Sequence, residues 1–475
     1  MEQEEFYQIL KQGFDFTPTA KQDIALQMLA NFVTHSGPDQ LFLLKGYAGT
    51  GKTSIMATLV SNLWKVKKSS YLLAPTGRAA KVLGNYSKRQ AHTIHRKIYT
   101  PRKKKGAGVV FVKLPNKHKN TIFIVDEASM IPDINESVNA KESGSLLEDL
   151  IQFVYSGYGC RLILIGDTAQ LPPVKLSISP ALDEHLLANQ FYKEVTTISL
   201  DEVVRQDKQS GILLNATQIR ERIDAQVYDD FKFNIHGLPD MIRPTDGQEI
   251  MDALNDSYSQ HGNEESVIIV RSNKRANLFN EQIRNRILFR ENQLEAGDFL
   301  MVVKNNYFWL KPDSEAGFIA NGDIIEVLEI FAISELYGFN FATVKIRMVD
   351  YPDIKPFETV LILDTLTTNT PSLTYDESNR LYEAVKEDYQ DEPSNYKKFL
   401  SIKNNKYFNA LQIKFSYAIT CHKSQGGQWK TVFIEQPYLP EGPDKEYMRW
   451  LYTAVTRATE KVYLMGFSSS FFLED

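Results

Sequence analysis

The chain has few cysteines and no long apolar stretch. Cys160 and Cys421 are its only cysteines among 475 residues, and they stand far apart in no metal-ligand spacing. This argues against a disulfide framework and fits a reducing compartment. No apolar run is long enough to cross a bilayer, and the acidic segment Met1 to Phe6 lacks the hydrophobic core of a signal peptide. We therefore expect a cytoplasmic protein with no membrane partner.

The chain also lacks an excess of positive charge. Its 54 Lys and Arg stand against 59 Asp and Glu, which gives a formal net charge of −5. This charge does not indicate a nucleic-acid partner. It does not exclude one either, because an enzyme can concentrate Lys and Arg in a single groove. The length predicts roughly two to four domains.

A phosphate-binding loop is present in residues 46–53, after the apolar run 41–44 and before a helical pattern. Its glycines permit a tight turn whose backbone N–H groups converge on a phosphate at a helix N-terminus. Lys52 then reaches the β- and γ-phosphates, and the Thr53 hydroxyl ligates Mg²⁺. The sequence therefore predicts a site for ATP formed by Gly46, Tyr47, Ala48, Gly49, Thr50, Gly51, Lys52, Thr53 and Ser54.

Short apolar runs alternate with helical patterns around this loop. They predict buried parallel strands at residues 41–44, 71–74, 122–125 and 162–165, and a second α/β unit has such runs at 267–270, 432–434 and 462–464. The polar segments that follow the first four strands should share one crevice of an open sheet. A basic, Gly-containing piece at 96–120 predicts an inserted hairpin, and turn signals with β-rich runs at 293–410 predict a small inserted barrel.

Asp126 and Glu127 follow one of the predicted strands and supply the second half of an ATP-hydrolysis site. Mg²⁺ takes few protein oxygens, so Asp126 can hold the metal while Glu127 orients or deprotonates the attacking water. Hydrolysis also needs positive charge on the γ-phosphate, for which Arg205 and Arg457 are candidates.

A series of segments resembles, in the same order, the motifs of superfamily 1 DNA helicases of the RecD/Dda type, with C-terminal motifs similar to those of UvrD and Rep. Together the segments span most of the chain. They are residues 16–22, 46–53, 74–80, 93–95, 126–129, 166–174, 204–206, 417–427 and 452–458.

The resemblance implies an α/β fold with two RecA-like P-loop motor domains, residues 1–187 and 188–475. The hairpin at 96–120 would interrupt the first domain, and an SH3-like barrel at 293–410 would interrupt the second. By the same resemblance Gln22 reads the adenine edge, Gln170 senses the γ-phosphate, and Arg205 and Arg457 act as arginine fingers across the cleft. Gly427 joins the nucleotide site.

The resemblance also implies residues that hold DNA phosphates without reading sequence. Each has a second reading, because Thr93 and His95 also suit a helix cap and His422 also suits a buried hydrogen-bonded histidine. Phe111 is the candidate pin aromatic at the junction of duplex and single strand, although it lies among valines that suit a hairpin core. The DNA-facing set is Pro75, Thr76, Thr93, His95, Phe111, Thr420 and His422.

The implied activity is that of an ATP- and Mg²⁺-dependent DNA helicase that moves 5′ to 3′ on single-stranded DNA and separates duplex as ATP closes the cleft and hydrolysis opens it. We expect a monomer that binds single strands and junctions, with a single-strand-binding, replication or repair protein as a partner.

Three alternatives stay open at the level of sequence. An RNA or RNA/DNA-hybrid helicase is the nearest, because no reader of the 2′-hydroxyl is identifiable. A non-motor clamp would be expected to have lost Lys52, Glu127 or Arg457, yet all three are present. A P-loop phosphotransferase would have no need of the second α/β unit.

The change Phe111→Ala tests the pin. Stacking a base on an aromatic ring contributes about 1 to 3 kcal/mol and tolerates any sequence, so the change should weaken strand separation more than ATP hydrolysis. Both rates are measured on one preparation with a tailed duplex. Equal losses would assign Phe111 to the hairpin core instead.

Overall fold

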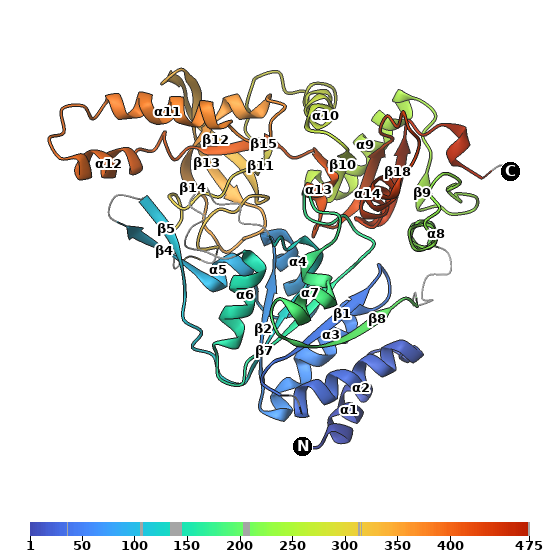
Figure 1. Cartoon of the computed structure of the whole chain (residues 1–475). Helices are drawn as coiled ribbons and strands as arrows, with labels where there is room; N and C mark the ends of the chain where they lie inside the picture. Colours follow the sequence, from blue (N-terminus) through green and yellow to red (C-terminus); the bar gives the residue numbers. More distant parts are fainter. Residues whose placement is uncertain are drawn as a thin grey trace.

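The chain forms two α/β units, a β-barrel and a short hairpin (Figure 1). The computed structural model describes residues 1–35, 37–104, 108–133, 145–202, 210–311, 314 and 316–473, without the side chains of residues 101–111. Within these ranges no helix combines the length and the apolar character that a membrane crossing requires.

The first sheet has six parallel strands in the order β3-β2-β6-β7-β1-β8. The predicted strands of the first unit are confirmed. The strands are β1 (Gln40–Gly46), β2 (Ser69–Ala74), β3 (Ala91–Thr93), β6 (Thr121–Val125), β7 (Arg161–Gly166) and β8 (Glu194–Leu200).

Helices cover both faces of this sheet, which is why its central strands are continuous apolar runs. The face that carries Phe42 and Leu44 packs against α1 (Gln3–Gln12), α2 (Ala20–His35), α3 (Lys52–Asn62) and α4 (Gly77–Ser87). The face that carries Leu41 and Leu43 packs against α5 (Ile94–Ile98), α6 (Leu146–Tyr155) and α7 (Glu184–Asn189).

The predicted boundary between the two motor domains, between residues 187 and 188, is wrong because β8 lies beyond it. This strand pairs in parallel with β1 from Gln40 to Gly46, so it belongs to the first sheet. It lies at the sheet edge and is only partly buried. An edge strand alternates apolar and polar residues, so it lacks the continuous apolar run that revealed its neighbours.

The second sheet has five strands in the order β16-β10-β17-β18-β9, all parallel. They are β9 (Met241–Ile242), β10 (Ser266–Val270), β16 (Ala418–Thr420), β17 (Trp429–Glu435) and β18 (Ala458–Met465). Its helices are α8 (Gly211–Ala225), α9 (Gly247–His261), α10 (Asn273–Arg286), α13 (Cys421–Ser424) and α14 (Lys445–Val455).

A closed five-stranded barrel is inserted into the second unit, as predicted. Its strands are β11 (Phe299–Val302), β12 (Ile324–Leu336), β13 (Phe339–Met348), β14 (Phe357–Ile362) and β15 (Leu411–Phe415), with α11 (Tyr375–Glu387) and α12 (Asn395–Lys403) between the last two. The predicted end at residue 410 falls one strand short, because β15 closes the barrel. Only two residues separate β15 from β16, so no loop marks the boundary.

The inserted hairpin is formed by β4 (Tyr99–Lys104) and β5 (Gly108–Lys113), which pair antiparallel. It leaves the first unit directly after α5. The side chain of Phe111 lies outside the described residues, so its role as a pin stays a prediction.

A buried carboxylate joins the barrel to the second sheet. Asp298, fully buried just before β11, accepts hydrogen bonds from Arg284 of α10 (3.0 and 3.1 Å) and Arg290 (2.7 Å). Tyr417, just before β16, donates to the same carboxylate at 3.1 Å. One buried arginine, Arg284, and one partly buried arginine, Arg290, therefore depend on one acid.

The change Asp298→Ala should lower the thermal unfolding midpoint sharply. It leaves Arg284 buried without its counter-charge, a situation that typically costs about 3 to 5 kcal/mol. The control is Glu383→Ala, which removes an exposed ion pair with Lys386 on α11 and should leave the midpoint unchanged. Equal midpoints for the two variants would show that the Asp298 cluster does not stabilise the fold.

Candidate active site and nucleic-acid interface

The phosphate-binding loop connects β1 to α3 and has the geometry of a cradle. Gly49 and Gly51 have positive φ values of 74° and 84°, and Gly51 precedes the first residue of α3. A side chain at Gly46 would meet Thr50 at 2.9 Å and Lys52 at 3.1 Å. The Lys52 ammonium donates to the carbonyl oxygens of Gly46 (2.8 Å) and Tyr47 (2.7 Å). The loop is therefore shaped for close approach to phosphates, and these residues fit ATP.

Gln22, the predicted adenine reader, supports this loop from α2. Its side chain is buried, with 2% exposure. The amide donates to the carbonyl of Thr50 (2.9 Å) and accepts from the backbone N–H of Thr19 (2.9 Å). Gln22 thus positions the loop in this structure, and its contact with adenine stays a prediction.

Thr53 and Ser54 occupy the first turn of α3, where both side chains are partly exposed. Thr53 is therefore placed to take the predicted metal role beside Lys52. Within the described ranges there is no group of three or more His, Cys, Asp or Glu side chains suited to hold a metal ion alone.

The predicted acid pair lies beyond β6. Glu127 has φ of 52°, a left-handed conformation unusual for its type, and its backbone N–H donates to Asp126 (2.8 Å). Burial raises the pKa of both carboxyls above their ordinary values. For Glu127 the nearby Arg457 opposes that rise. A carboxylate with a raised pKa is a stronger base, which suits the role predicted for Glu127.

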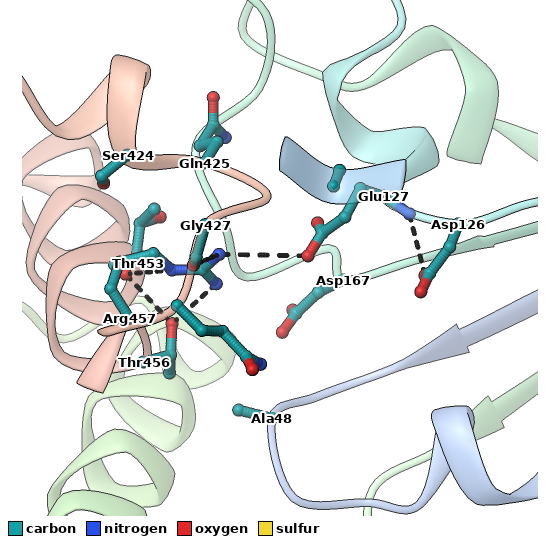
Figure 2. Close-up of polar contacts among 12 residues, drawn as sticks. Ala48, Asp126, Glu127, Asp167, Ser424, Gln425, Gly427, Thr453, Thr456 and Arg457 are labelled. Atoms are coloured by element: carbon teal, nitrogen blue, oxygen red, sulfur yellow. Dashed lines mark hydrogen bonds and ion pairs between the residues drawn. The ribbon is translucent and has the colours of Figure 1, made fainter. Parts of the chain in front are cut away.

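Arg457 reaches the acid pair from the second unit (Figure 2). It follows α14, is 4% exposed, and its guanidinium lies 3.9 Å from the Glu127 carboxylate. It also donates to the carbonyl oxygens of Thr453 (3.0 Å) and Gly427 (3.2 Å). The structure therefore brings Arg457, Gly427 and Glu127 together. The other predicted finger, Arg205, lies outside the described residues.

Gln170, the predicted γ-phosphate sensor, follows β7 in the same crevice. Its side chain is 7% exposed, and its Oε1 is a buried acceptor with no hydrogen-bond partner among the described residues. A buried polar atom without a partner is unfavourable, so it marks a position where a water or ligand can bind.

Sequence reasoning did not single out Asp167 or Tyr452, although both stand inside the quoted motifs. The Tyr452 hydroxyl donates to Asp167 (2.7 Å) and accepts from the backbone N–H of Ala48 (2.9 Å). Another cross-unit bond runs from the Leu171 N–H to Thr453 (2.9 Å). Asp167 and Tyr452 are 285 positions apart, so no local sequence pattern could have revealed their contact.

Thr76 and Thr93 both cap helices. Thr76 accepts from the N–H of Ala79 at the start of α4 (3.2 Å), and Thr93 accepts from the N–H of Arg96 at the start of α5 (3.3 Å). The capping reading of Thr93 is therefore confirmed, while its contact with DNA stays a prediction. Pro75 directly precedes Thr76, at the carboxyl end of β2.

Burial favours the neutral form of His95 and of His422. Burial lowers the pKa of His95 to about 4 and lowers that of His422 below its ordinary value. Each ring can still form hydrogen bonds. Thr420, the last residue of β16, directly precedes α13, and its side chain does not cap that helix.

The loop after α13 lies against the start of α4. It thus brings together two of the segments that are predicted to bind DNA, one with Thr76 and one with Thr420. Gly426 has φ of 72°, and a side chain there would meet Ala79 at 2.7 Å and Thr76 at 3.4 Å. Arg78 of α4 also stacks on the Trp429 ring at 4.0 Å. The segments of Thr76 and Thr420 therefore form one surface.

The barrel contacts the same surface. Lys81 of α4 donates to the carbonyl of Val349 (3.1 Å), and Arg96 of α5 donates to that of Ser314 (3.0 Å). Three separate parts of the chain thus meet at the starts of α4 and α5.

Two family models match the chain. The model described as an AAA domain matches residues 22–232, which include the phosphate-binding loop and the acid pair. The model described as a UvrD-like helicase C-terminal domain matches residues 415–465, which include the loop after α13 and Arg457. The two family models thus match different parts of the chain.

Known proteins are similar over part or most of the chain. The ATP-dependent DNA helicase dda of Enterobacteria phage T4 is 24% identical over 88% of this chain and 93% of its own length. The ATP-dependent RecD2 DNA helicase of Deinococcus radiodurans is 32% identical over 37% of this chain and 21% of its own length. The solved structure of Pif1 helicase from Bacteroides with ADP-AlF3 and ssDNA is 14% identical, covers 97% of this chain and 95% of that chain, and has a TM-score of 0.47.

The change Arg457→Ala should reduce kcat for ATP hydrolysis by about 10³-fold, because an arginine that stabilises γ-phosphate charge contributes on that scale. Nucleotide affinity should fall far less. The control is Arg271→Ala, which removes an exposed arginine paired with Glu446 in the same unit. Turnover is compared at saturating ATP, and similar rates for both variants would remove Arg457 from the active site.

Proposed function

Because the chain belongs to the superfamily 1 helicases of the RecD/Dda type, we propose that it is an ATP-dependent DNA helicase that moves along single-stranded DNA in the 5′ to 3′ direction. It separates duplex at junctions by closing and opening the cleft between its two RecA-like domains.

The observation that carries this proposal is the meeting of Glu127 and Arg457 across the cleft, 3.9 Å apart and from different sheets. The phosphate-binding loop and acid pair come from one domain and the buried cation from the other. A γ-phosphate contacted from both sides favours the closed cleft, and its loss favours opening. This supports a motor rather than a static ATPase.

We assign each residue of this site a role in ATP hydrolysis. Lys52 binds the β- and γ-phosphates, Glu127 orients the attacking water and accepts its proton, and Arg457 stabilises the developing charge. Thr53 and Asp126 would hold Mg²⁺, which would supply further positive charge to the nucleotide phosphates.

The DNA site proposed here is the surface where α4, α5 and the loop after α13 meet. Backbone N–H groups and hydroxyls of Thr76 and Thr420 suit phosphate contacts that read no sequence. The relatives named as DNA helicases support DNA as the substrate. A monomer in a reducing cytoplasm, with both cysteines free and buried, completes the proposal.

The alternative is an RNA helicase with the same motor. It would use the same phosphate contacts, so the two activities differ only in how strongly each strand stimulates ATP hydrolysis. A phosphotransferase is disfavoured by the cross-cleft contact of Arg457, which a kinase of small molecules does not require.

Single-stranded DNA should stimulate ATP hydrolysis more strongly than single-stranded RNA of the same sequence, and Lys52→Ala should abolish hydrolysis while DNA binding remains. Lys65→Ala, at an exposed lysine away from the loop, is the control. Hydrolysis and strand separation are measured on tailed DNA and RNA duplexes. Equal or greater stimulation by RNA would favour the alternative, and stimulation by neither strand would contradict a nucleic-acid motor.

A further inference from the structure

Tyr452 of the second domain contacts the backbone of the phosphate-binding loop. Tyr452 lies on α14 with 1% exposure, and its hydroxyl accepts a hydrogen bond from the backbone N–H of Ala48 at 2.9 Å. Ala48 is the third residue of the loop that begins at Gly46. A loop N–H is thereby tied to the opposite domain.

The same hydroxyl has a second, charged partner. It donates to the carboxylate of Asp167 at 2.7 Å, and Asp167 also accepts from the N–H of Ala169 at 2.9 Å. A tyrosine hydroxyl can donate its one proton and at the same time accept a hydrogen bond through the lone pairs of its oxygen. Both bonds can therefore form together. Burial and the adjacent carboxylate of Asp167 raise the pKa of Tyr452 well above its ordinary value, which keeps that proton in place.

Tyr452 is also coupled to the arginine that completes the active site. The next residue, Thr453, accepts a hydrogen bond from the Arg457 guanidinium through its carbonyl (3.0 Å). Its hydroxyl accepts from the N–H of Leu171 in the first domain (2.9 Å). A displacement of α14 therefore moves Tyr452 and the support of Arg457 together.

We propose that Tyr452 is a positioning residue that links the conformation of the phosphate-binding loop to the placement of Arg457. The phosphate-binding loop, through the Ala48 N–H, and Asp167 are both hydrogen-bonded to the single Tyr452 hydroxyl of α14. A change in the loop on nucleotide binding is transmitted to α14 and from there to the surface formed with α4. The inference rests on the proposed function and assigns it a specific coupling residue.

The chain offers a matched pair of variants on one helix. Tyr447, also on α14 and fully buried, donates its hydroxyl to Gln436 (2.8 Å) inside the second domain. Tyr452→Phe and Tyr447→Phe each remove one buried hydroxyl, but only the first removes a bond across the cleft. The kcat and KM for ATP are measured for both variants and the wild type, with and without single-stranded DNA, alongside thermal unfolding.

Tyr452→Phe should reduce the ratio of DNA-stimulated to basal kcat by about tenfold, the usual scale of coupling between two sites, while Tyr447→Phe keeps the wild-type ratio. A wild-type ratio in Tyr452→Phe, or equal losses in both variants, would overturn the inference. If Tyr452→Phe does not fold, Asp167→Asn removes the charged acceptor and should lower the ratio in the same direction, and an unchanged ratio there overturns the inference instead. A wild-type enzyme that DNA does not stimulate contradicts the proposed function itself.

Discussion

The rest of the structure depends on burying a cation between two sheets. Arg457 is almost inaccessible to water, and it is tolerated there because carbonyl oxygens of its own domain and a carboxylate of the other surround it. A buried charge without such partners is strongly unfavourable. The contact between the two domains therefore satisfies Arg457, and the same contacts hold it beside Glu127, where the proposed mechanism needs positive charge.

The buried carboxylates of the first domain also need partners that offset their charge. Asp126, Glu127 and Asp167 follow neighbouring strands of the first sheet, and burial raises the pKa of all three. Lys52 and Arg457 oppose that rise for Asp167, and Tyr452 donates to its carboxylate. The buried carboxylates and the nearby cations therefore offset each other's charge, so an added anionic ligand would change this balance. This gives nucleotide binding a physical means to act on the position of the second domain.

The barrel and the loop after α13 both contact the surface that we propose as the DNA site. Val349 and Ser314 of the barrel accept hydrogen bonds from Lys81 of α4 and Arg96 of α5, and Gly426 of the loop lies close to the start of α4. The chain as a whole is acidic. The proposed DNA site would therefore depend on local geometry and on backbone N–H groups more than on net charge. The anchor at Asp298 keeps the barrel attached to the second sheet, so movement of that domain carries the barrel with it.

The sequence by itself determined the elements that are local in the chain. The phosphate-binding loop, the acid pair after its strand and the central strands of both sheets were predictable, because glycine conformations, buried apolar runs and helix starts are set by neighbouring residues. The edge strand β8 and the closing strand β15 were misassigned, since pairing with a distant strand decides their membership. The contacts of Tyr452 with Ala48 and Asp167, and of Arg457 with Glu127, join residues hundreds of positions apart, and only the packing of two domains brings them together.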